Sequence, residues 1–341
     1  MVKIEIFIYK IDIITNNMYK LDVKDRKLLY ELDLNSRQSF SELGKKIRLN
    51  KNTVQYRISK LLQEGVIKRF YTLIDTAKLG YLTFRVFLRF QNLTEERERE
   101  IIQYLLNNPK VGWMVSLEGN WDLNFMIWVK SHYEFDEFWH KFKFKFEENL
   151  VNKWVSLFVR LHFYSKAYLV NKKVDDTKSI ILYDKAEQEI KIDDKDLVIL
   201  KSLAEDARTS ILEISKKANL SINIVKERIR RLKQNEIIKA YKPMIDLDKI
   251  SYRYYKVHFE LKGVDEKNWE MIKSFCHLHP NILDFNELIN GADLELDVQV
   301  KDDVELRKFI SEIRNKFQKF IKDYEVLHYY KEHKFMFFPI E

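Results

Sequence analysis

Apolar residues recur at the spacing of an α-helix in three short segments that follow one another near the start of the chain. The first segment, residues 23–35, carries a leucine stripe formed by Leu28, Leu29 and Leu32. The second segment follows Ser39, which makes an S-x-x-E capping box with Glu42, and the third follows Asn50, a favourable N-cap residue. The pattern predicts three short helices joined by tight turns.

After residue 65 the pattern becomes that of strands and longer helices. Two β-rich runs, VIKRFYTLID and YLTFRVFLRF, come first. The segments after them predict a helix, two strands around a turn at Gly119 and Asn120, a second helix and a last strand, at residues 94–106, 111–117, 122–129, 133–148 and 154–163. From the second run onwards the order is β-α-β-β-α-β, which is that of a ferredoxin-like domain.

This whole pattern occurs twice. A shift of 171 residues aligns the chain with itself from Leu21 to Leu79 without a gap, and 21 of the 55 positions in residues 21–75 are identical to their partners. The same register continues through Pro109 and Pro280. A duplicated unit of this size usually does in one chain what a homodimer of single units does.

The repeat changes its spacing near the end of each half. The motif LHFY at residues 161–164 resembles LHYY at residues 327–330, which lies 166 residues later. We therefore expect that the second half has lost five residues around its last helix. On this alignment His162 and His328 occupy equivalent positions on the last strands.

The predicted fold class is α+β, with two tandem units. In each unit a helix-turn-helix domain of the winged-helix type precedes a ferredoxin-like βαββαβ domain. The expected boundaries are an N-terminal extension, a first helix-turn-helix domain, a first ferredoxin-like domain, a linker, a second helix-turn-helix domain and a second ferredoxin-like domain, at residues 1–20, 21–79, 80–170, 171–190, 191–250 and 251–341. Residues 1–17 alternate like an edge strand, and a start codon assigned too early is the alternative.

Composition narrows the class of protein. Hydrophobic residues make up 46% of the 341 residues, as in folded domains. Cys276 is the single cysteine, so no internal disulfide can form, and we expect a reducing cytoplasm. No run approaches 18 uncharged apolar residues, so no membrane span is expected. Cys276, His277 and His279 in the stretch CHLHP could together touch a metal, but no second pair of such ligands lies elsewhere, so the stretch is interpreted as a helix end before Pro280 and no metal is expected. Glycine-rich phosphate loops and nucleophile elbows are absent, and no cofactor is expected.

The basic charge lies in the repeated helical segments. The chain carries a net charge of +8. Residues 21–79 hold 13 Lys and Arg against 7 Asp and Glu, and residues 192–250 hold 13 against 10. This distribution is typical of a surface that binds a polyanion such as double-stranded DNA. A generally lysine-rich composition is the alternative explanation.

The third predicted helix has the pattern of a DNA-reading helix. Val54, Ile58 and Leu61 form its apolar stripe. Its opposite face carries side chains that can contact base edges or phosphates in a major groove, namely Lys51, Asn52, Gln55, Tyr56, Ser59 and Lys60. Lys45 and Lys46 in the preceding helix are placed to touch the DNA backbone. An ordinary amphipathic helix with a solvated polar face is the alternative.

The second copy of this helix presents a different outward face. The expected DNA contacts there are Asn223, Lys226, Glu227, Arg230 and Arg231. Ile222 and Ile224 replace Lys51 and Thr53 of the first copy. Glu227 can accept a hydrogen bond from cytosine or repel phosphate. We therefore expect an asymmetric pair of half-sites rather than a perfect palindrome.

The sequence resembles the Lrp/AsnC family of feast/famine regulators. The resemblance rests on LDVKDRKLLYEL at 21–32, NSRQSFSELGKKIRLNKNTVQYRISKLLQEGVIKRFYTLIDTAKLG at 35–80, LEGNWDL at 117–123, and the corresponding helix-turn-helix residues 192–203 and 206–246. It implies transcription regulation through DNA binding. It also implies that residues 67–74 pair with residues 238–245 inside one chain, and that the two ferredoxin-like sheets pack face to face.

Further site residues follow from the same resemblance. Arg57 and Arg228 resemble the family's arginine inside the reading helix, where they contact phosphate or brace the fold. An amino acid or other small effector is expected near the glycine turn, at Gly119, Asn120, Asp122 and, in the second half, Asp293. The second turn reads NGAD, with Gly291 two residues before Asp293. Further self-association through the sheets is also implied.

Two other classes of function share this format. The siroheme decarboxylases are built from the same two-part unit, sometimes as a fused pair, but residues 35–46 lack the pattern of their first domain and keep an intact reading helix. We therefore expect a protein without enzymatic activity. A chromatin-like protein that coats DNA with low specificity is the other alternative, and only the ratio of specific to non-specific affinity separates it from a regulator.

Overall fold

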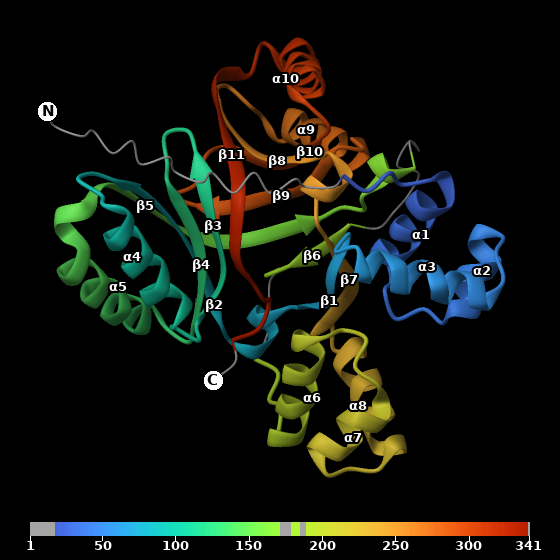
Figure 1. Cartoon of the computed structure of the whole chain (residues 1–341). Helices are drawn as coiled ribbons and strands as arrows, with labels where there is room; N and C mark the ends of the chain where they lie inside the picture. The colour runs from blue at the N-terminus through green and yellow to red at the C-terminus, as the bar shows by residue number, and fades with distance from the viewer. Residues whose placement is uncertain (1–17, 171–178, 185–188, 340–341) are drawn as a thin grey trace, which may run out of the picture.

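The computed structural model describes residues 18–170, 179–184 and 189–339. Two helix-turn-helix modules lie on one side of a β-barrel that carries helices on its outer surface (Figure 1). The expectations for residues 1–17, and most of the expected linker, fall outside the described residues. Within the described part of the chain, no helix is long and apolar enough to cross a membrane.

The first helix-turn-helix module contains α1 (Val23–Leu34), α2 (Phe40–Ile47) and α3 (Lys51–Gln63). The caps explain where these helices begin. Ser39 and Glu42 form the expected capping box, and the Asn50 side chain accepts from the Thr53 N–H. The apolar faces of the three helices pack into one core. The three predicted helices are therefore confirmed.

The second module repeats the first helix by helix. It contains α6 (Asp194–Glu205), α7 (Ile211–Ala218) and α8 (Ile222–Gln234), and each of these helices begins and ends 171 residues after its counterpart. The predicted cap at Ser221 accepts from the Ile224 N–H. The same local signals therefore produce the same three helices in both halves.

A two-stranded antiparallel ribbon joins the modules. It consists of β1 (Ile67–Ile74) and β7 (Ile238–Ile245), paired from Ile67 with Ile245 to Ile74 with Ile238. The pairing that the family resemblance implied is therefore confirmed. Helix α1 packs against β7 and α6 packs against β1, so the first helix of each module contacts a strand of the other half. Both modules consequently share one hydrophobic core.

The ferredoxin-like strands form one closed sheet. The strand order is β2-β4-β3-β11-β8-β10-β9-β5, and β5 pairs again with β2. The shorter strands are β2 (Leu82–Phe90), β3 (Val111–Glu118), β4 (Leu123–Val129), β6 (Ile180–Leu182), β8 (Arg253–Leu261), β9 (Ile282–Ile289) and β10 (Leu294–Val300). Strand β6 adds to the end of β5.

The expectation of two separate sheets packed face to face is wrong in one respect. The halves do face each other, but β5 (Leu150–Phe163) and β11 (Ile321–Phe335) each pair with a strand of both halves and join the sheets at both edges. These two strands are long enough, at 14 and 15 residues, to reach past their own sheet. A closed sheet leaves no unpaired edge, which explains why the halves join in this way.

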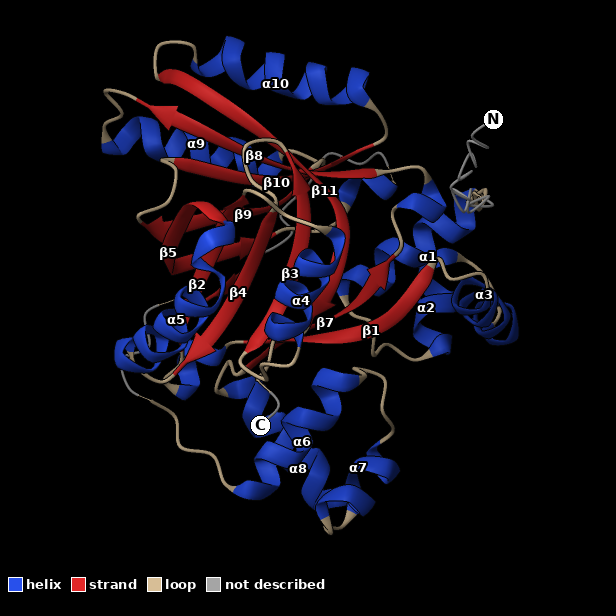
Figure 2. Cartoon of the chain, turned by 60° about the vertical axis from the view of Figure 1, so that its left-hand side comes forward, coloured by secondary structure: helices blue, strands red, loops and turns tan. Residues whose placement is uncertain are grey.

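Four helices cover the outside of the barrel. Helices α4 (Glu95–Leu106) and α5 (His132–Phe146) lie on the first half, and α9 (Glu266–Leu278) and α10 (Asp303–Phe317) lie on the second (Figure 2). Each pair forms a core of its own with the outer face of its half-sheet. The CHLHP stretch lies at the end of α9, as the sequence indicates.

The expected loss of five residues in the second half is wrong. Phe84 pairs with Leu157 between β2 and β5, and Tyr255 pairs with His328 between β8 and β11, so the repeat keeps its spacing of 171 to the last strand. His162 therefore corresponds to His333, not to His328. Strand pairing decides this equivalence, because a slip of five residues would turn every side chain of the strand to the opposite face.

Candidate nucleic-acid interface

The polar face of α3 is free to meet another molecule. All six predicted contact residues of this helix are exposed, and Tyr56 has 65% of its surface accessible. Val54, Ile58 and Leu61 are buried on the opposite face, as predicted. Because a major groove accepts an α-helix with its polar side chains outward, this arrangement suits base reading.

The outward face of α8 is less suited to DNA. Asn223 and Lys226 are exposed, but Glu227 forms an ion pair with Arg230 at 2.5 Å along the helix. Hydrogen bonding to Arg230 lowers the pKa of the Glu227 carboxyl. Ile222 and Ile224 are 41% and 46% exposed, where the first copy has Lys51 and Thr53. The two reading faces therefore differ in chemistry, as the sequence predicts.

Arg57 and Arg228 brace their modules from inside. The Arg57 Nη1 atom lies 2.7 Å from Asp22 Oδ2 and 2.7 Å from Asp25 Oδ1, which ties α3 to the start of α1. Arg228 makes the same contacts with Asp193 and Asp196.

The second module has one further ion pair of this kind, in which Arg231 Nη2 lies 2.6 Å from Asp196 Oδ2. The bracing role that the sequence left open is thus the one for which contacts are present. A phosphate contact by Arg57, Arg228 or Arg231 stays a prediction.

The two lysines of α2 are both exposed, and Lys46 forms an ion pair. Lys45 and Lys46 are both exposed in the last turn of the helix. Lys46 Nζ lies 2.9 Å from the carboxylate of Glu31 on α1. Since an exposed ion pair contributes little and exchanges easily with water, Lys46 can still turn to a phosphate.

A buried ion cluster holds the first module only. Asp33 at the end of α1 receives Lys166 Nζ at 2.9 Å and Lys242 Nζ at 3.2 Å, and all three side chains are buried. Burial raises the pKa of the Asp33 carboxyl, but attraction to the two lysines outweighs burial and holds the pKa at about 2. The second copy has Ala204 at the position of Asp33, so comparison of the two copies could not predict this cluster.

The glycine turns of the two halves meet in one open groove of about 730 Å³ at the end of the barrel. Gly119, Asn120 and Asp293 line it, beside Trp121 and Trp154.

Asp122 is not part of this lining. Its Oδ2 accepts from the Phe90 N–H at 2.7 Å and its Oδ1 from Arg89 at 2.9 Å, so it anchors the turn. Asp293 makes the equivalent bond with Leu261 N–H at 2.7 Å. The predicted effector residues thus come together except Asp122, and both aspartates hold the fold.

Comparison with known proteins places the chain in a family. A winged helix-turn-helix DNA-binding model matches residues 21–68, and an AsnC-type helix-turn-helix model matches residues 192–233. An HTH-type transcriptional regulator of Pyrococcus abyssi is 34% identical over 104 residues, which are 30% of this chain and 69% of that protein. Another, from Pyrococcus furiosus, is 30% identical over 118 residues, 35% of this chain and 78% of that protein.

The chain belongs to the Lrp/AsnC family. In this Lrp/AsnC protein the first matched segment contains α1–α3 and the second contains α6, α7 and all but the last residue of α8, so each half has one helix-turn-helix module. It is a DNA-binding transcription regulator of the Lrp/AsnC type.

The complete two-unit arrangement has a counterpart among solved structures. The siroheme decarboxylase NirDL superposes over 92% of this Lrp/AsnC chain and 93% of its own, with a TM-score of 0.59 and 14% sequence identity. At this identity the likeness concerns the fold alone. It shows that a second single chain has a similar fold over nearly its whole length.

Proposed function

We propose that this Lrp/AsnC protein is a sequence-specific regulator, acting in the cytoplasm without catalysis, whose two modules bind one DNA duplex as a built-in pseudo-dimer. On this proposal residues 21–79 and 191–250 are the DNA-binding domains, and residues 80–170 and 251–341 serve effector binding and assembly. The observation that carries it is the exposed polar face of α3, held at a fixed position relative to α8 by the shared core and the β1–β7 ribbon.

The two modules contribute unequally on this proposal. The first supplies base reading through Asn52, Gln55 and Tyr56, because Asn and Gln can make two-point contacts with adenine. The second supplies mainly phosphate contacts through Lys226 and through Arg230, whose exposed ion pair with Glu227 can open at little cost. The preferred DNA is then a strong half-site beside a weak one.

A small effector, an amino acid by analogy with the family resemblance, would bind in the groove where the glycine turns meet. Gly119 and Asn120 come from the first half and Asp293 from the second, so a ligand there touches both halves. Such a ligand can shift the equilibrium between arrangements of the halves only if it binds one of them more tightly.

Binding to fragments of the source genome across a salt series, with a random duplex as competitor, tests the proposal. Affinity that falls steeply with salt and keeps a preference of roughly a thousandfold for certain fragments supports a sequence-specific regulator. Salt-sensitive binding without preference would indicate an architectural protein instead. Absence of binding at low salt would contradict any DNA-binding role and direct attention to tetrapyrrole substrates.

A further inference from the structure

The first turn of the second reading helix carries two isoleucines that lie outside the apolar core. Ile222 and Ile224 of α8 are 41% and 46% exposed. Neither residue belongs to the core shared by the two modules or to the partly buried residues packed against it. Val225 in the same turn is fully buried, so the helix has its apolar anchor there without them. Packing within the module therefore does not explain why these two positions are apolar.

Helix formation does not explain the isoleucines either. Isoleucine is branched at Cβ and favours a helix less than lysine does, and Lys51 occupies the position of Ile222 in the first copy. The cap at Ser221 accepts from the Ile224 N–H at 3.3 Å, which uses only the main chain of Ile224. Two large apolar side chains exposed within one turn therefore indicate contact with another molecule.

The neighbours of the isoleucines indicate what this molecule is. Asn223 lies between them, and since successive residues of a helix are turned by about 100°, one isoleucine lies on each side of it. Asn223 and Lys226 are both exposed. In helix-turn-helix proteins the first residues of the second helix are those that contact base edges. The isoleucines thus occupy positions that would face base pairs in a major groove.

The major groove offers one apolar group, which is the C5-methyl of thymine. The other three bases present hydrogen-bond donors and acceptors there, and an isoleucine side chain cannot pair with these. Contact with a thymine methyl removes apolar surface of both partners from water. An apolar protein surface fits less well, because the exposed residues between 226 and 231 are three basic residues and one acidic residue, namely Lys226, Arg230, Arg231 and Glu227.

We propose that Ile222 and Ile224 determine specificity by contacting the C5-methyl groups of thymines in the half-site of the second module. Asn223 would make a two-point contact with an adenine between them. The second half-site then contains A·T pairs that are read mainly through their methyl groups, in addition to the phosphate contacts of Lys226. This inference rests on the proposed function, because it assigns a base-reading role within the same DNA complex.

The first module provides an internal comparison. Its helix α3 has Lys51 and Thr53 at the two positions. The lysine ammonium is strongly hydrated and does not replace an apolar contact, and threonine carries a single methyl group. The half-site of α3 should therefore depend less on thymine methyl groups than the half-site of α8.

Replacement of thymine by deoxyuracil tests the proposal on the full chain. Deoxyuracil forms the same base pair and keeps the same phosphates, and it lacks only the C5-methyl. The selected binding site is prepared with uracil in one half-site at a time. Gln55→Ala should change the selected sequence in the half-site of α3, which tells the two halves apart. We expect binding at least about fourfold weaker with uracil in the half-site of α8, and a smaller loss in the other.

A double substitution connects the effect with the two isoleucines. Ile222→Ser with Ile224→Ser removes both exposed apolar side chains and keeps the cap at Ser221, so it should bind the thymine and uracil duplexes equally. Val304→Ser, at a position on α10 that is 61% exposed, is the matched control and should keep the parental preference for thymine. The comparison of thymine with uracil on the parent chain stays decisive if the double variant fails to fold.

Equal affinity of the parent chain for thymine and uracil in the half-site of α8 would overturn the proposal. A loss with uracil that persists in the double variant would also overturn it, because other residues would then contact the methyl groups. Sequence-specific binding without a uracil effect removes this inference and keeps the regulator, whereas a chain that binds no DNA removes both.

Discussion

Arg37 and Arg208, which occupy equivalent positions in the two halves, each donate hydrogen bonds to the main chain of the opposite module. Arg37 Nη1 lies 2.5 Å from Ala207 O and 3.0 Å from Thr209 O, and Arg208 Nη1 donates to Ser36 O. The backbone repeats this exchange, with Ser36 N–H donating to Tyr241 O at 2.8 Å and Ala207 N–H donating to Phe70 O at 3.1 Å. These reciprocal contacts hold the two modules at one spacing.

Loss of this contact should loosen the spacing without damaging either reading helix. We expect Arg37→Ala to lower the affinity for a duplex with two half-sites about tenfold, because hydrogen bonds from a charged group contribute about 1.5–3 kcal/mol. Affinity for a single half-site should stay the same. Arg99→Ala, at an exposed position on α4, is the control. Equal losses on both duplexes would show that Arg37 acts through general stability or phosphate contact.

The reading role of α3 predicts a change in preference. Gln55→Ala with Tyr56→Ala should relax sequence selectivity by roughly tenfold or more, since each good base contact discriminates by about 1–3 kcal/mol. Selection of binding sites from a random library measures this. Gln63→Ala, exposed at the end of the same helix, should leave the selected site as it is. An unchanged site in the double variant would sink the assignment of these two residues.

The turn after each reading helix has a backbone conformation that favours glycine in both copies. Gly65 has φ +72°, where an added Cβ would meet only the Lys249 side chain at 3.9 Å, and Glu236 at the equivalent position has φ +56°. A residue with a Cβ pays about 1–2 kcal/mol in this conformation.

Gly65→Ala should therefore lower the free energy of unfolding by about 1 kcal/mol, and Glu236→Gly should raise it by a similar amount, measured by urea unfolding. Glu236→Gln keeps the strained backbone and separates the effect of the charge beside Lys239. A destabilising Glu236→Gly would contradict the strain argument.

Asp75 predicts a pH dependence with a definite sign. Its carboxyl is fully buried, and burial raises its pKa to about 6, although hydrogen bonds from Tyr183 and Ala77 N–H act against the rise. Between about pH 4 and pH 6 the folded chain therefore binds more protons at this site than the unfolded chain. Stability should fall as pH rises through this window, by up to about 3 kcal/mol.

Asp75→Asn should remove this fall, because an amide oxygen can accept the same two hydrogen bonds without ionising. Urea unfolding at a series of pH values from 4 to 7 measures the difference from the parent chain. Asp246→Asn, at the equivalent position beside Lys68, is the matched control and should keep the parental pH profile. Parallel profiles for the parent and Asp75→Asn would count against the buried carboxyl as the source.

Local sequence signals were sufficient to predict where the helices begin and which face of α3 is exposed. Caps at Ser39, Asn50 and Ser221 begin helices where the pattern predicts, because capping depends on neighbouring residues alone. The stripe of Val54, Ile58 and Leu61 likewise decided which side of α3 is exposed.

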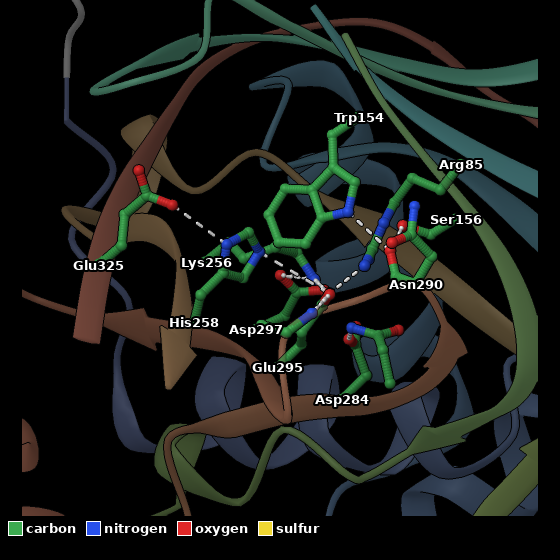
Figure 3. Close-up of polar contacts among 12 residues, drawn as sticks. Arg85, Trp154, Ser156, Lys256, His258, Asp284, Asn290, Glu295, Asp297 and Glu325 are labelled. Carbon is green, nitrogen blue, oxygen red and sulfur yellow. Dashed lines mark hydrogen bonds and ion pairs between the residues drawn. The ribbon is translucent and has the colours of Figure 1, made fainter. Parts of the chain in front are cut away.

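The interior contacts could not be predicted in this way. The position of Arg37 and Arg208 holds arginine in both copies. This identity indicated that the position has a role, but it did not indicate a contact between the modules. The ion pairs of Asp33 with Lys242 and of Arg85 with Glu295 (Figure 3) join residues of different halves and are not repeated, so neither periodicity nor comparison of the two copies could predict them. The similarity of LHFY and LHYY indicated the wrong alignment of the two last strands, since side-chain identity does not determine strand pairing.

The sequence by itself determined the duplication, the order of helices and strands, the basic reading modules and their unequal faces, because these depend on residues close together in the chain. Only the tertiary structure decided that β5 and β11 close one barrel, that each module leans on the other half, and that buried charges of both halves surround a cavity. These features depend on hydrogen bonds and burial between residues more than 100 positions apart, where no local pattern records the partner.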